Sequence, residues 1–259
     1  MKQTLEIVKK IAIEAGHFQL KRLGHIKSIS YKGRMNLVTD VDKASEDIIF
    51  RRLSRHFPDY KVLSEEAGGS YRISSQPKWV IDPLDGTTNY AHGFPVFSVS
   101  IALEKSGSIV LGVVYDPTRN ELFSAAKDMG AFCNNKRIKV SSVKLIEKSL
   151  LATGFPYKFG KDMQRNVENF KNFMMRAQAV RRAGSAALDL CYVAYGRFEG
   201  FWEQDLHAWD TPAGAIIVKE AGGVLSNFKG EPFNHYKKEI VASNSRIHSA
   251  MLKILSKTA

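Results

Sequence analysis

Two aspartates lie three positions apart in the stretch Asp82-Pro83-Leu84-Asp85-Gly86, and their type and spacing suit them to chemistry. The apolar run before them is predicted to be a strand that ends at Asp82, because Pro83 has no N–H to donate to a sheet. Asp85-Gly86 favours a turn, so both carboxylates and the Leu84 carbonyl are expected on one small loop. Such hard oxygen ligands are those that Mg²⁺ prefers. Taken alone, the same stretch also fits an ordinary turn that binds nothing.

Two further acidic sites lie at the ends of predicted elements. Glu65-Glu66 follows a short strand, and Asp210 precedes a helix. Each has a simpler interpretation, since an acidic pair on a loop is normally solvated and an aspartate before a helix is often its N-cap. Two carboxylates about 4 Å apart repel by roughly 4 kcal/mol at an effective dielectric of 20. If the three sites converge, they therefore need a compensating cation.

The charge along the chain is uneven. The 259 residues include 38 Lys and Arg against 26 Asp and Glu, a net charge of +12. Residues 62–126 nevertheless hold 4 basic and 7 acidic residues, and residues 183–218 hold 1 basic and 5 acidic. These two acidic segments contain all the candidate metal ligands and predict bound cations. Residues 127–182, with 13 basic and 4 acidic residues, are the part of the chain suited to a polyanion.

Several classes of protein are excluded. A composition with 44% hydrophobic and 25% charged residues excludes disorder. No apolar run approaches the roughly 20 residues of a membrane span, and charges from Glu6 to Glu14 interrupt any signal peptide. Cys133 and Cys191 lack CxxC spacing, so we expect free, buried thiols in a cytoplasmic protein. The chain has no GxGxxG or GxxxxGK[ST] motif, which disfavours dinucleotide and P-loop chemistry.

Hydrophobic periodicity predicts a mixed α/β chain with helices between two groups of strands. The helices are expected over 4–23, 43–57, 162–178, 186–194, from 210 to 222, and 247–255. The strands are expected over 60–64, 79–82, 97–103, 109–115, 122–126, 150–153, 198–203, 224–227 and 240–243. We expect Asp42 as the N-cap of the second helix and Asn134-Asn135 as a hairpin turn. The length predicts one domain, with intimate lobes over about 1–145 and 146–259.

The three acidic motifs, in this order, resemble those of the inositol monophosphatase family. The resemblance rests on Glu65-Glu66, on Asp82-Pro-Leu-Asp85-Gly86-Thr87-Thr88-Asn89 and on Trp209-Asp210-Thr-Pro-Ala-Gly214. It extends to 36–42 and 184–187, and over 152–158 and 181–190 the chain is most similar to the bacterial SuhB subgroup. Pro212 stands where the family usually has Ala or Gly, but the first helical turn needs no N–H there. The resemblance implies a layered αβαβα sandwich, a homodimer and inhibition by lithium.

The resemblance also implies a metal site and a hydrolytic mechanism. Glu65, Asp82 and the Leu84 carbonyl would hold one Mg²⁺. Asp82, Asp85 and Asp210 would hold a second, and a third, weaker ion would lie near Glu65. The ions would bind the phosphate and activate a water that attacks phosphorus.

Other residues acquire roles by the same resemblance. Thr87, oriented by Asp42, would position or deprotonate the attacking water through the neighbouring Glu65. The free N–H groups of Gly86 and Thr87 would bind phosphate oxygens. The polyol would contact Asp85, Ser185, Ala186, Glu203 and Asp210. A carboxylate such as Glu203 can accept hydrogen bonds from two adjacent hydroxyls, although a solvated glutamate at a strand end fits equally well. Lys32 is a weaker candidate for a cation near the metals.

The implied activity is the Mg²⁺-dependent hydrolysis of myo-inositol monophosphates. Relatives in the superfamily cleave nucleoside 3′(2′),5′-bisphosphates or fructose 1,6-bisphosphate instead. Asn89 after Thr-Thr favours inositol phosphates, because the nucleotidases generally have Lys-Glu in that region. The SuhB likeness implies a second class of function, binding to RNA or to a transcription complex, which the basic segment 127–182 would support. A solvated basic face is the simpler interpretation of that segment, since no RRM, KH or zinc-finger pattern accompanies it.

Overall fold

The chain alternates helices and strands in a computed structural model that describes residues 1–31, 37–158 and 160–258. The helices are α1 (Lys2–Arg22), α2 (Asp40–His56), α3 (Thr87–Ala91), α4 (Lys161–Met174), α5 (Ala186–Ala194), α6 (Pro212–Glu220) and α7 (His248–Leu255), with 3₁₀ turns over Ile146–Lys148 and Ser256–Thr258. The strands are β1 (Ile29–Tyr31), β2 (Leu37–Thr39), β3 (Lys61–Ser64), β4 (Gly68–Gly69), β5 (Lys78–Asp85), β6 (Ser98–Lys105), β7 (Ser108–Asp116), β8 (Glu121–Ala126), β9 (Gly130–Cys133), β10 (Lys136–Ile138), β11 (Leu150–Thr153), β12 (Ala179–Arg181), β13 (Gly200–Gln204), β14 (Val224–Ser226) and β15 (Glu239–Ser243).

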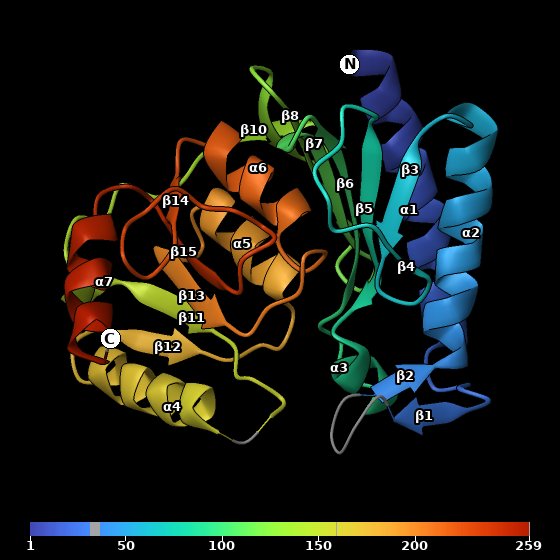
Figure 1. The fold of residues 1–259 in the computed structure, drawn as a ribbon. Helices are drawn as coiled ribbons and strands as arrows, with labels where there is room; N and C mark the ends of the chain where they lie inside the picture. Colours follow the sequence, from blue (N-terminus) through green and yellow to red (C-terminus); the bar gives the residue numbers. More distant parts are fainter. Residues whose placement is uncertain (32–36, 159, 259) are drawn as a thin grey trace.

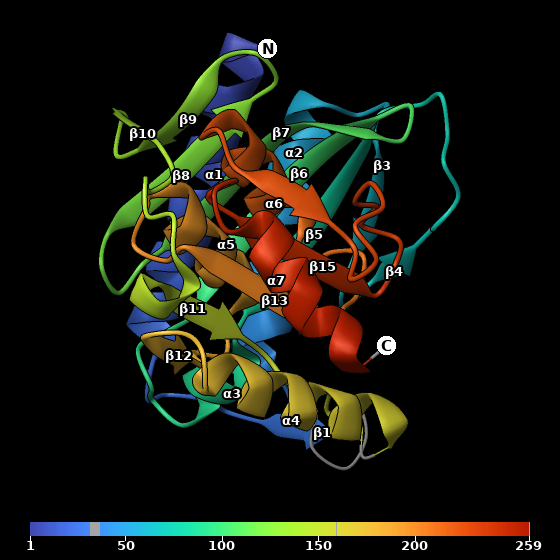
Figure 2. The same ribbon diagram turned by 90° about the vertical axis from the view of Figure 1, so that its left-hand side faces the viewer.

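These elements form five layers, which Figure 1 shows from right to left. Helices α1 and α2 cover one face of an eight-stranded sheet of order β10-β9-β8-β7-β6-β5-β3-β4. Helices α5 and α6 pack between that sheet and a five-stranded sheet of order β12-β11-β13-β15-β14. Helices α4 and α7 lie on the outer face of the smaller sheet, which faces the viewer in Figure 2. The predicted αβαβα sandwich is confirmed.

Side-chain alternation along β5 determines which way its acidic end faces. Trp79 and Ile81 pack in the core under α1 and α2, whereas Val80 packs in the core that contains α5 and α6. Because successive side chains of a strand point to opposite faces, Asp82 shares the face of Val80. The strand therefore directs Asp82 into the space between the two sheets.

The smaller sheet directs an acid into the same space by the same rule. On β13, Trp202 packs in the outer core with α4 and α7, whereas Phe201 packs in the inner core with α5 and α6. Glu203 therefore faces inward from β13. Both sheets present acidic side chains toward the α5–α6 layer, although β5 and β13 are more than a hundred residues apart in the chain.

Three local expectations are wrong. The N-cap of α2 is Thr39, and Asp42 completes a capping box with it instead of capping the helix itself. Strand β5 does not end at Asp82 but continues to Asp85, with an irregular register around Pro83. Helix α4 ends at Met174 instead of continuing to residue 178, and the chain then leads into β12. Lys32 lies outside the described residues.

Two other expectations are confirmed. Asn134 and Asn135 both have positive φ and join β9 to β10 in a hairpin. Cys133 and Cys191 are free and buried. In the described part of the chain, no helix is long and apolar enough to cross a membrane.

A buried polar cluster joins the large sheet to the loop before β15. The Lys78 ammonium lies 3.6 Å from the Glu104 carboxylate, and both side chains are 1% exposed. Lys78 donates a hydrogen bond to the Tyr236 hydroxyl, which in turn donates to Glu104. Lys78 also donates to the carbonyls of Ser70 and Arg72. The cluster thus fixes the segment that follows β4 against both sheets.

We expect Glu104→Gln to destabilise the protein by about 3 to 5 kcal/mol, because the Lys78 charge would then be buried without its counter-charge. The measurement is the free energy of urea unfolding. Glu14→Gln is the matched control, since it removes the exposed ion pair with Arg52 and should cost less than about 1 kcal/mol. Equal losses for the two variants would contradict the assignment of a tightly coupled buried pair.

Candidate active site

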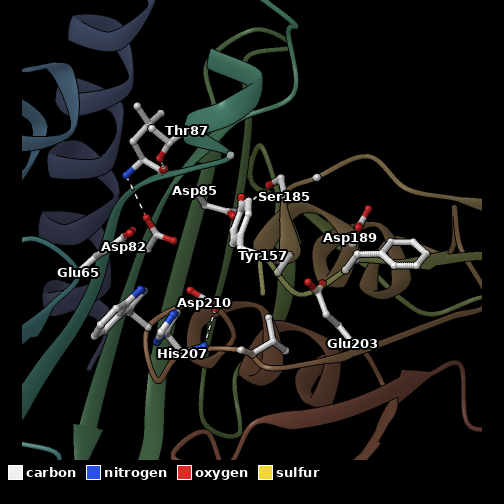
Figure 3. A pocket seen from close by; sticks show the side chains of 18 of the residues that line it. Glu65, Asp82, Asp85, Thr87, Tyr157, Ser185, Asp189, Glu203, His207 and Asp210 are labelled. Atoms are coloured by element: carbon white, nitrogen blue, oxygen red, sulfur yellow. Dashed lines mark hydrogen bonds between the residues drawn. The ribbon is translucent and has the colours of Figure 1, made fainter. Parts of the chain in front are cut away.

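A pocket opens between the two sheets, and of the predicted site residues that the structure describes, all except Asp42 line it (Figure 3). The predicted residues on its wall are Glu65, Asp82, Leu84, Asp85, Gly86, Thr87, Ser185, Ala186, Glu203 and Asp210. They come from the turn after β3, the end of β5, the starts of α3 and α5, strand β13 and the turn before α6. The fold therefore gathers into one place acids that lie on separate elements.

The irregular end of β5 holds Asp82 and Asp85 on this wall. The Asp82 carboxylate accepts a hydrogen bond of 3.1 Å from the Leu84 amide, two residues further along. The side-chain amide of Gln19 on α1 donates a hydrogen bond of 2.6 Å to the Pro83 carbonyl. Both aspartates are buried, with 3% and 8% of their surfaces exposed.

The start of α5 binds one oxygen of Asp85. Its Oδ2 accepts hydrogen bonds from the Ser185 hydroxyl and from the Ala187 amide, the latter at 3.0 Å. The Ser98 hydroxyl on β6 donates to the same oxygen at 3.3 Å. Asp85 is therefore fixed from both sheet and helix, and it joins the two sides of the pocket.

Glu65 is positioned by a residue that the sequence did not single out. Glu46 on α2 accepts hydrogen bonds from the Ser64 hydroxyl and from the amides of Glu66 and Ala67, the last two at 3.2 and 3.1 Å. The turn after β3 is thus bound to α2 on both sides of Glu65. Only the long-range packing of α2 against the sheet reveals this role.

Asp210 lies in the turn before α6, where its Oδ2 accepts the His207 amide at 2.7 Å. The N-cap of α6 is Thr211, and Pro212 occupies the first helical turn as expected. The His207 and Trp209 rings stack at 5.1 Å between centroids, and Trp209 also contacts Tyr71. Asp210 is therefore not the N-cap of the helix, and its carboxylate lies on the pocket wall.

Burial and mutual repulsion raise the pKa values of the aspartates in this pocket. Burial raises the pKa of Asp85 to about 6. Burial, followed by the charges of Glu65, Asp85 and Asp210, raises the pKa of Asp82 well above its usual range. The pKa of Asp210 rises well above its usual value for the same reasons. Such a concentration of perturbed acids is typical of a functional site.

Thr87 and Asp42 form a hydrogen-bonded pair at the edge of the pocket. The Thr87 hydroxyl lies 2.8 Å from Asp42 Oδ1 and 3.0 Å from the Leu84 carbonyl, so its single proton can go to either. The other carboxylate oxygen of Asp42 accepts the Thr39 amide and hydroxyl at 2.8 and 2.6 Å. The capping box of α2 therefore also orients Asp42 toward Thr87.

The turn at Gly86 brings backbone N–H groups to the pocket. Gly86 has φ +91°, and a Cβ there would lie 2.8 Å from the Val96 carbonyl, so only glycine fits. Asn89 ties this turn to the connection between β12 and α5, because its amide donates to the carbonyls of Val96 and Ala183 at 2.7 and 2.8 Å. The first turn of α3 is thereby fixed against residues 183–184.

Comparison with known proteins identifies the relatives of this chain. The model of the inositol monophosphatase family matches residues 1–258. The chain belongs to the inositol monophosphatase family. It is 41% identical to an inositol-1-monophosphatase of Mesorhizobium japonicum, over 98% of this chain and 96% of that protein. It is 43% identical to the Nus factor SuhB of Haemophilus influenzae, over 97% and 95% of the two chains.

A solved structure agrees with this placement in the inositol monophosphatase family. The extragenic suppressor protein SuhB of Bartonella henselae superposes with a TM-score of 0.93 at 39% identity, covering 98% of this chain and 99% of that one. The chain is therefore an enzyme of this family, a phosphoric monoester hydrolase. The pocket in Figure 3 is the candidate active site of that phosphatase.

The acids of the phosphatase pocket are not arranged around one enclosed point. Among the residues that the structure describes, no three Asp, Glu, His or Cys side chains gather closely enough to enclose an ion. The acids instead line a shared wall, which is what mutual repulsion between carboxylates favours. Metal binding in this member of the inositol monophosphatase family therefore stays a prediction.

The sequence did not single out several lining residues of the phosphatase pocket. Tyr157, Arg182 and Asp189 line the pocket beside Glu203. Gly154 leaves room for this glutamate, because a Cβ at that position would lie 2.0 Å from Glu203 Oε1. Gly154, Tyr157, Arg182 and Asp189 lie in segments that resemble the SuhB subgroup, but the spacing of the motifs predicted no role for them.

We expect Glu203 to make the phosphatase less stable as the pH rises. Burial raises its pKa from 4.5 to about 8, so between these values the folded state binds the proton more tightly than the unfolded state. The contribution of Glu203 to stability is then greatest below pH 4.5 and is lost as the pH rises toward 8. The carboxylate keeps some exposure to water, so we expect a difference of about 2 kcal/mol.

The measurement for Glu203 is thermal unfolding of the wild-type protein and Glu203→Gln in EDTA from pH 5 to pH 9. The two proteins should be alike at pH 5, and the variant should be the more stable at pH 9. A difference that stays constant across this range would contradict the prediction.

Proposed function

We propose that this protein hydrolyses myo-inositol monophosphates to inositol and phosphate with the help of Mg²⁺. The observation that carries the proposal is the convergence of Glu65, Asp82, Asp85 and Asp210 on one buried pocket. A phosphate dianion cannot approach these acids unless cations first reverse the sign of the local potential. Two relatives of different names, an inositol-1-monophosphatase and a SuhB protein, are similar along almost the whole chain.

The candidate ligands are of the chemical type that Mg²⁺ prefers. The candidate ligands are Glu65, Asp82, the Leu84 carbonyl, Asp85 and Asp210, all of them oxygen donors on one wall. The raised pKa values of Asp82 and Asp210 mean that these acids lack compensating charge in the protein itself. When bound, such ions supply the positive charge that neutralises the phosphate and makes a water molecule more acidic.

The residues of the chain itself then orient the reaction. With its proton directed to Asp42, the Thr87 hydroxyl keeps a lone pair for the attacking water. The N–H groups of Gly86 and Thr87, at the start of α3, are available to phosphate oxygens. On the alcohol side, Ser185 fixes Asp85, and Glu203 offers a carboxylate to ring hydroxyls.

Thr87→Val and Asp42→Asn should each lower kcat about a hundredfold, the range of a positioned proton acceptor. Because the two residues act as one pair, the double variant should lose little more than either single variant. The measurement is kcat for myo-inositol 1-phosphate in saturating Mg²⁺. Thr118→Val removes a similar hydroxyl hydrogen bond, to Asp116 at 2.7 Å outside the pocket, and should leave kcat unchanged. Fully additive losses would contradict the pairing.

A substrate panel tests the choice of alcohol. We expect kcat/KM for myo-inositol 1-phosphate to exceed the values for adenosine 3′,5′-bisphosphate and fructose 1,6-bisphosphate. A higher value for either of the other two would replace the proposed substrate while leaving the phosphatase assignment intact. Lithium should inhibit the reaction in each case.

A second function, binding to RNA or to a transcription complex, is suggested by relatives that are named Nus factor SuhB. The basic segment 127–182 gives it little support in three dimensions. Lys136 and Arg137 lie on β10, whereas Lys161 begins α4 and Arg181 lies on β12. Figures 1 and 2 place β10 and α4 at opposite ends of the molecule, so these charges do not form one face. RNA binding that weakens steeply with salt would nevertheless support this function.

A further inference from the structure

Asp189 is a buried acid on the pocket wall that neither the fold nor the proposed metal site explains. It lies in the first turn of α5, and only 1% of its surface is exposed. Its Oδ1 has no hydrogen-bond partner among the described residues. A buried polar atom without a partner destabilises the fold, and a ligand that donates a hydrogen bond to it would remove that cost. The side chain nevertheless lines the same pocket as Asp85 and Glu203.

The acids of the pocket lie on two sides. Figure 3 shows Asp189 and Glu203 together, across the pocket from Glu65 and Asp82. Burial, followed by the charges of Glu203 and Asp85, raises the pKa of Asp189, whereas the charge of Arg182 lowers the pKa of both Asp189 and Glu203. We call Asp189, Glu203 and Arg182 the distal wall.

The chemistry of the distal wall selects hydroxyl groups. Two carboxyl groups can accept several hydrogen bonds from a ring that carries adjacent hydroxyls. Arg182 can donate to the same hydroxyl oxygens, and it would repel an ammonium group. A neutral polyol satisfies both kinds of group at once. An aryl group offers no donor to Asp189 and leaves its oxygen unpaired.

We propose that Asp189 binds ring hydroxyls of the substrate on the side away from the phosphate and is a specificity-determining residue for polyol phosphates. This inference rests on the proposed function and extends it to a residue with no assigned role. A residue kept for binding need not stabilise the fold. Because Oδ1 has no partner to lose, its removal should leave the protein as stable as before, or more stable.

The test compares wild-type protein, Asp189→Asn and Asp189→Leu in Mg²⁺ on two substrates. Myo-inositol 1-phosphate has ring hydroxyls, and p-nitrophenyl phosphate has none. Asp189→Leu, which offers no acceptor to a hydroxyl, should lose about tenfold or more in kcat/KM for the inositol ester, mostly through KM, and Asp189→Asn, which keeps one acceptor oxygen, should lose less. Their kcat/KM for the aryl ester should stay within about twofold. Their Tm should be unchanged or raised.

Each other outcome overturns the inference. An equal loss on both substrates together with a lower Tm would make Asp189 a structural residue. No loss on either substrate would show that it does not contact the alcohol. If wild-type protein hydrolyses p-nitrophenyl phosphate but not the inositol ester, the proposed polyol substrate fails as well. If one variant does not fold, the other decides, because one keeps the polarity of the side chain and the other suits the apolar interior of α5.

Discussion

Asp85→Asn is expected to lower kcat/KM for myo-inositol 1-phosphate about a thousandfold, the loss that accompanies several kcal/mol of charge stabilisation by a bound metal. An asparagine can still accept the hydrogen bonds of Ser185 and Ala187 through its carbonyl oxygen. Its NH₂ group then faces the pocket, where a cation would otherwise bind. The variant should therefore fold normally and bind Mg²⁺ poorly.

The same variant should be more stable than the wild-type protein when metal is absent. Burial raises the pKa of Asp85 to about 6, so its ionised form destabilises the fold at pH 8. A neutral amide removes that penalty, which we expect to be about 2 kcal/mol in the free energy of unfolding. Activity and stability thus change in opposite directions, as expected of a residue kept for function.

Asp116→Asn is the matched control for Asp85→Asn. Asp116 is also fully buried, but it has partners of its own, because Thr118 and Arg119 donate to its carboxylate at 2.7 and 3.0 Å. Its variant should lose stability and keep its activity. If Asp85→Asn instead loses stability and retains more than about a tenth of the wild-type kcat/KM, Asp85 is a structural residue and not a metal ligand.

Removal of Mg²⁺ by EDTA should abolish hydrolysis, and addition of Mg²⁺ should restore it. The expected loss is at least a thousandfold, because the acids of the pocket repel a phosphate when no cation is bound. The measurement is the rate of phosphate release from myo-inositol 1-phosphate at increasing free Mg²⁺. A rate in EDTA equal to that in Mg²⁺ would contradict metal dependence.

Stability should follow the metal as well. Mg²⁺ at about 100 times its dissociation constant should stabilise the wild-type protein by about 2.7 kcal/mol. The gain should increase as the pH rises, because the ions compete with protons for the same carboxylates. Asp85→Asn should show a much smaller gain. A gain that is equal in the two proteins would show that the ions bind elsewhere.

The sequence predicted the layers of the fold and most of the acids of the site. The segments 79–82 and 198–203 were recognised as strands, and the alternation of side chains along a strand turns Asp82 and Glu203 inward. The motifs on separate elements could be grouped through their resemblance to one family. The acidic segments of a basic chain also pointed to the residues that converge.

The remaining features depend on contacts that no local pattern encodes. Glu46 holds the turn at Glu65 only because α2 packs beside β3. The N-cap of α2 is Thr39, and Asp42 completes the capping box with it. The other oxygen of Asp42 reaches Thr87. Asp189 is read from the sequence as one more residue of a buried helix. Its proposed role follows from its place on the wall of the pocket that α5 borders.

The most direct test of the central claim is the anomalous scattering of Mn²⁺ in crystals of this protein, because Mn²⁺ accepts the same oxygen ligands as Mg²⁺. We expect peaks in the pocket bounded by Glu65, Asp82 and the Leu84 carbonyl, and by Asp82, Asp85 and Asp210. The same crystals of Asp85→Asn should lose the second peak. A pocket without a peak at saturating Mn²⁺, or peaks bound only by other residues, would contradict the proposed metal site.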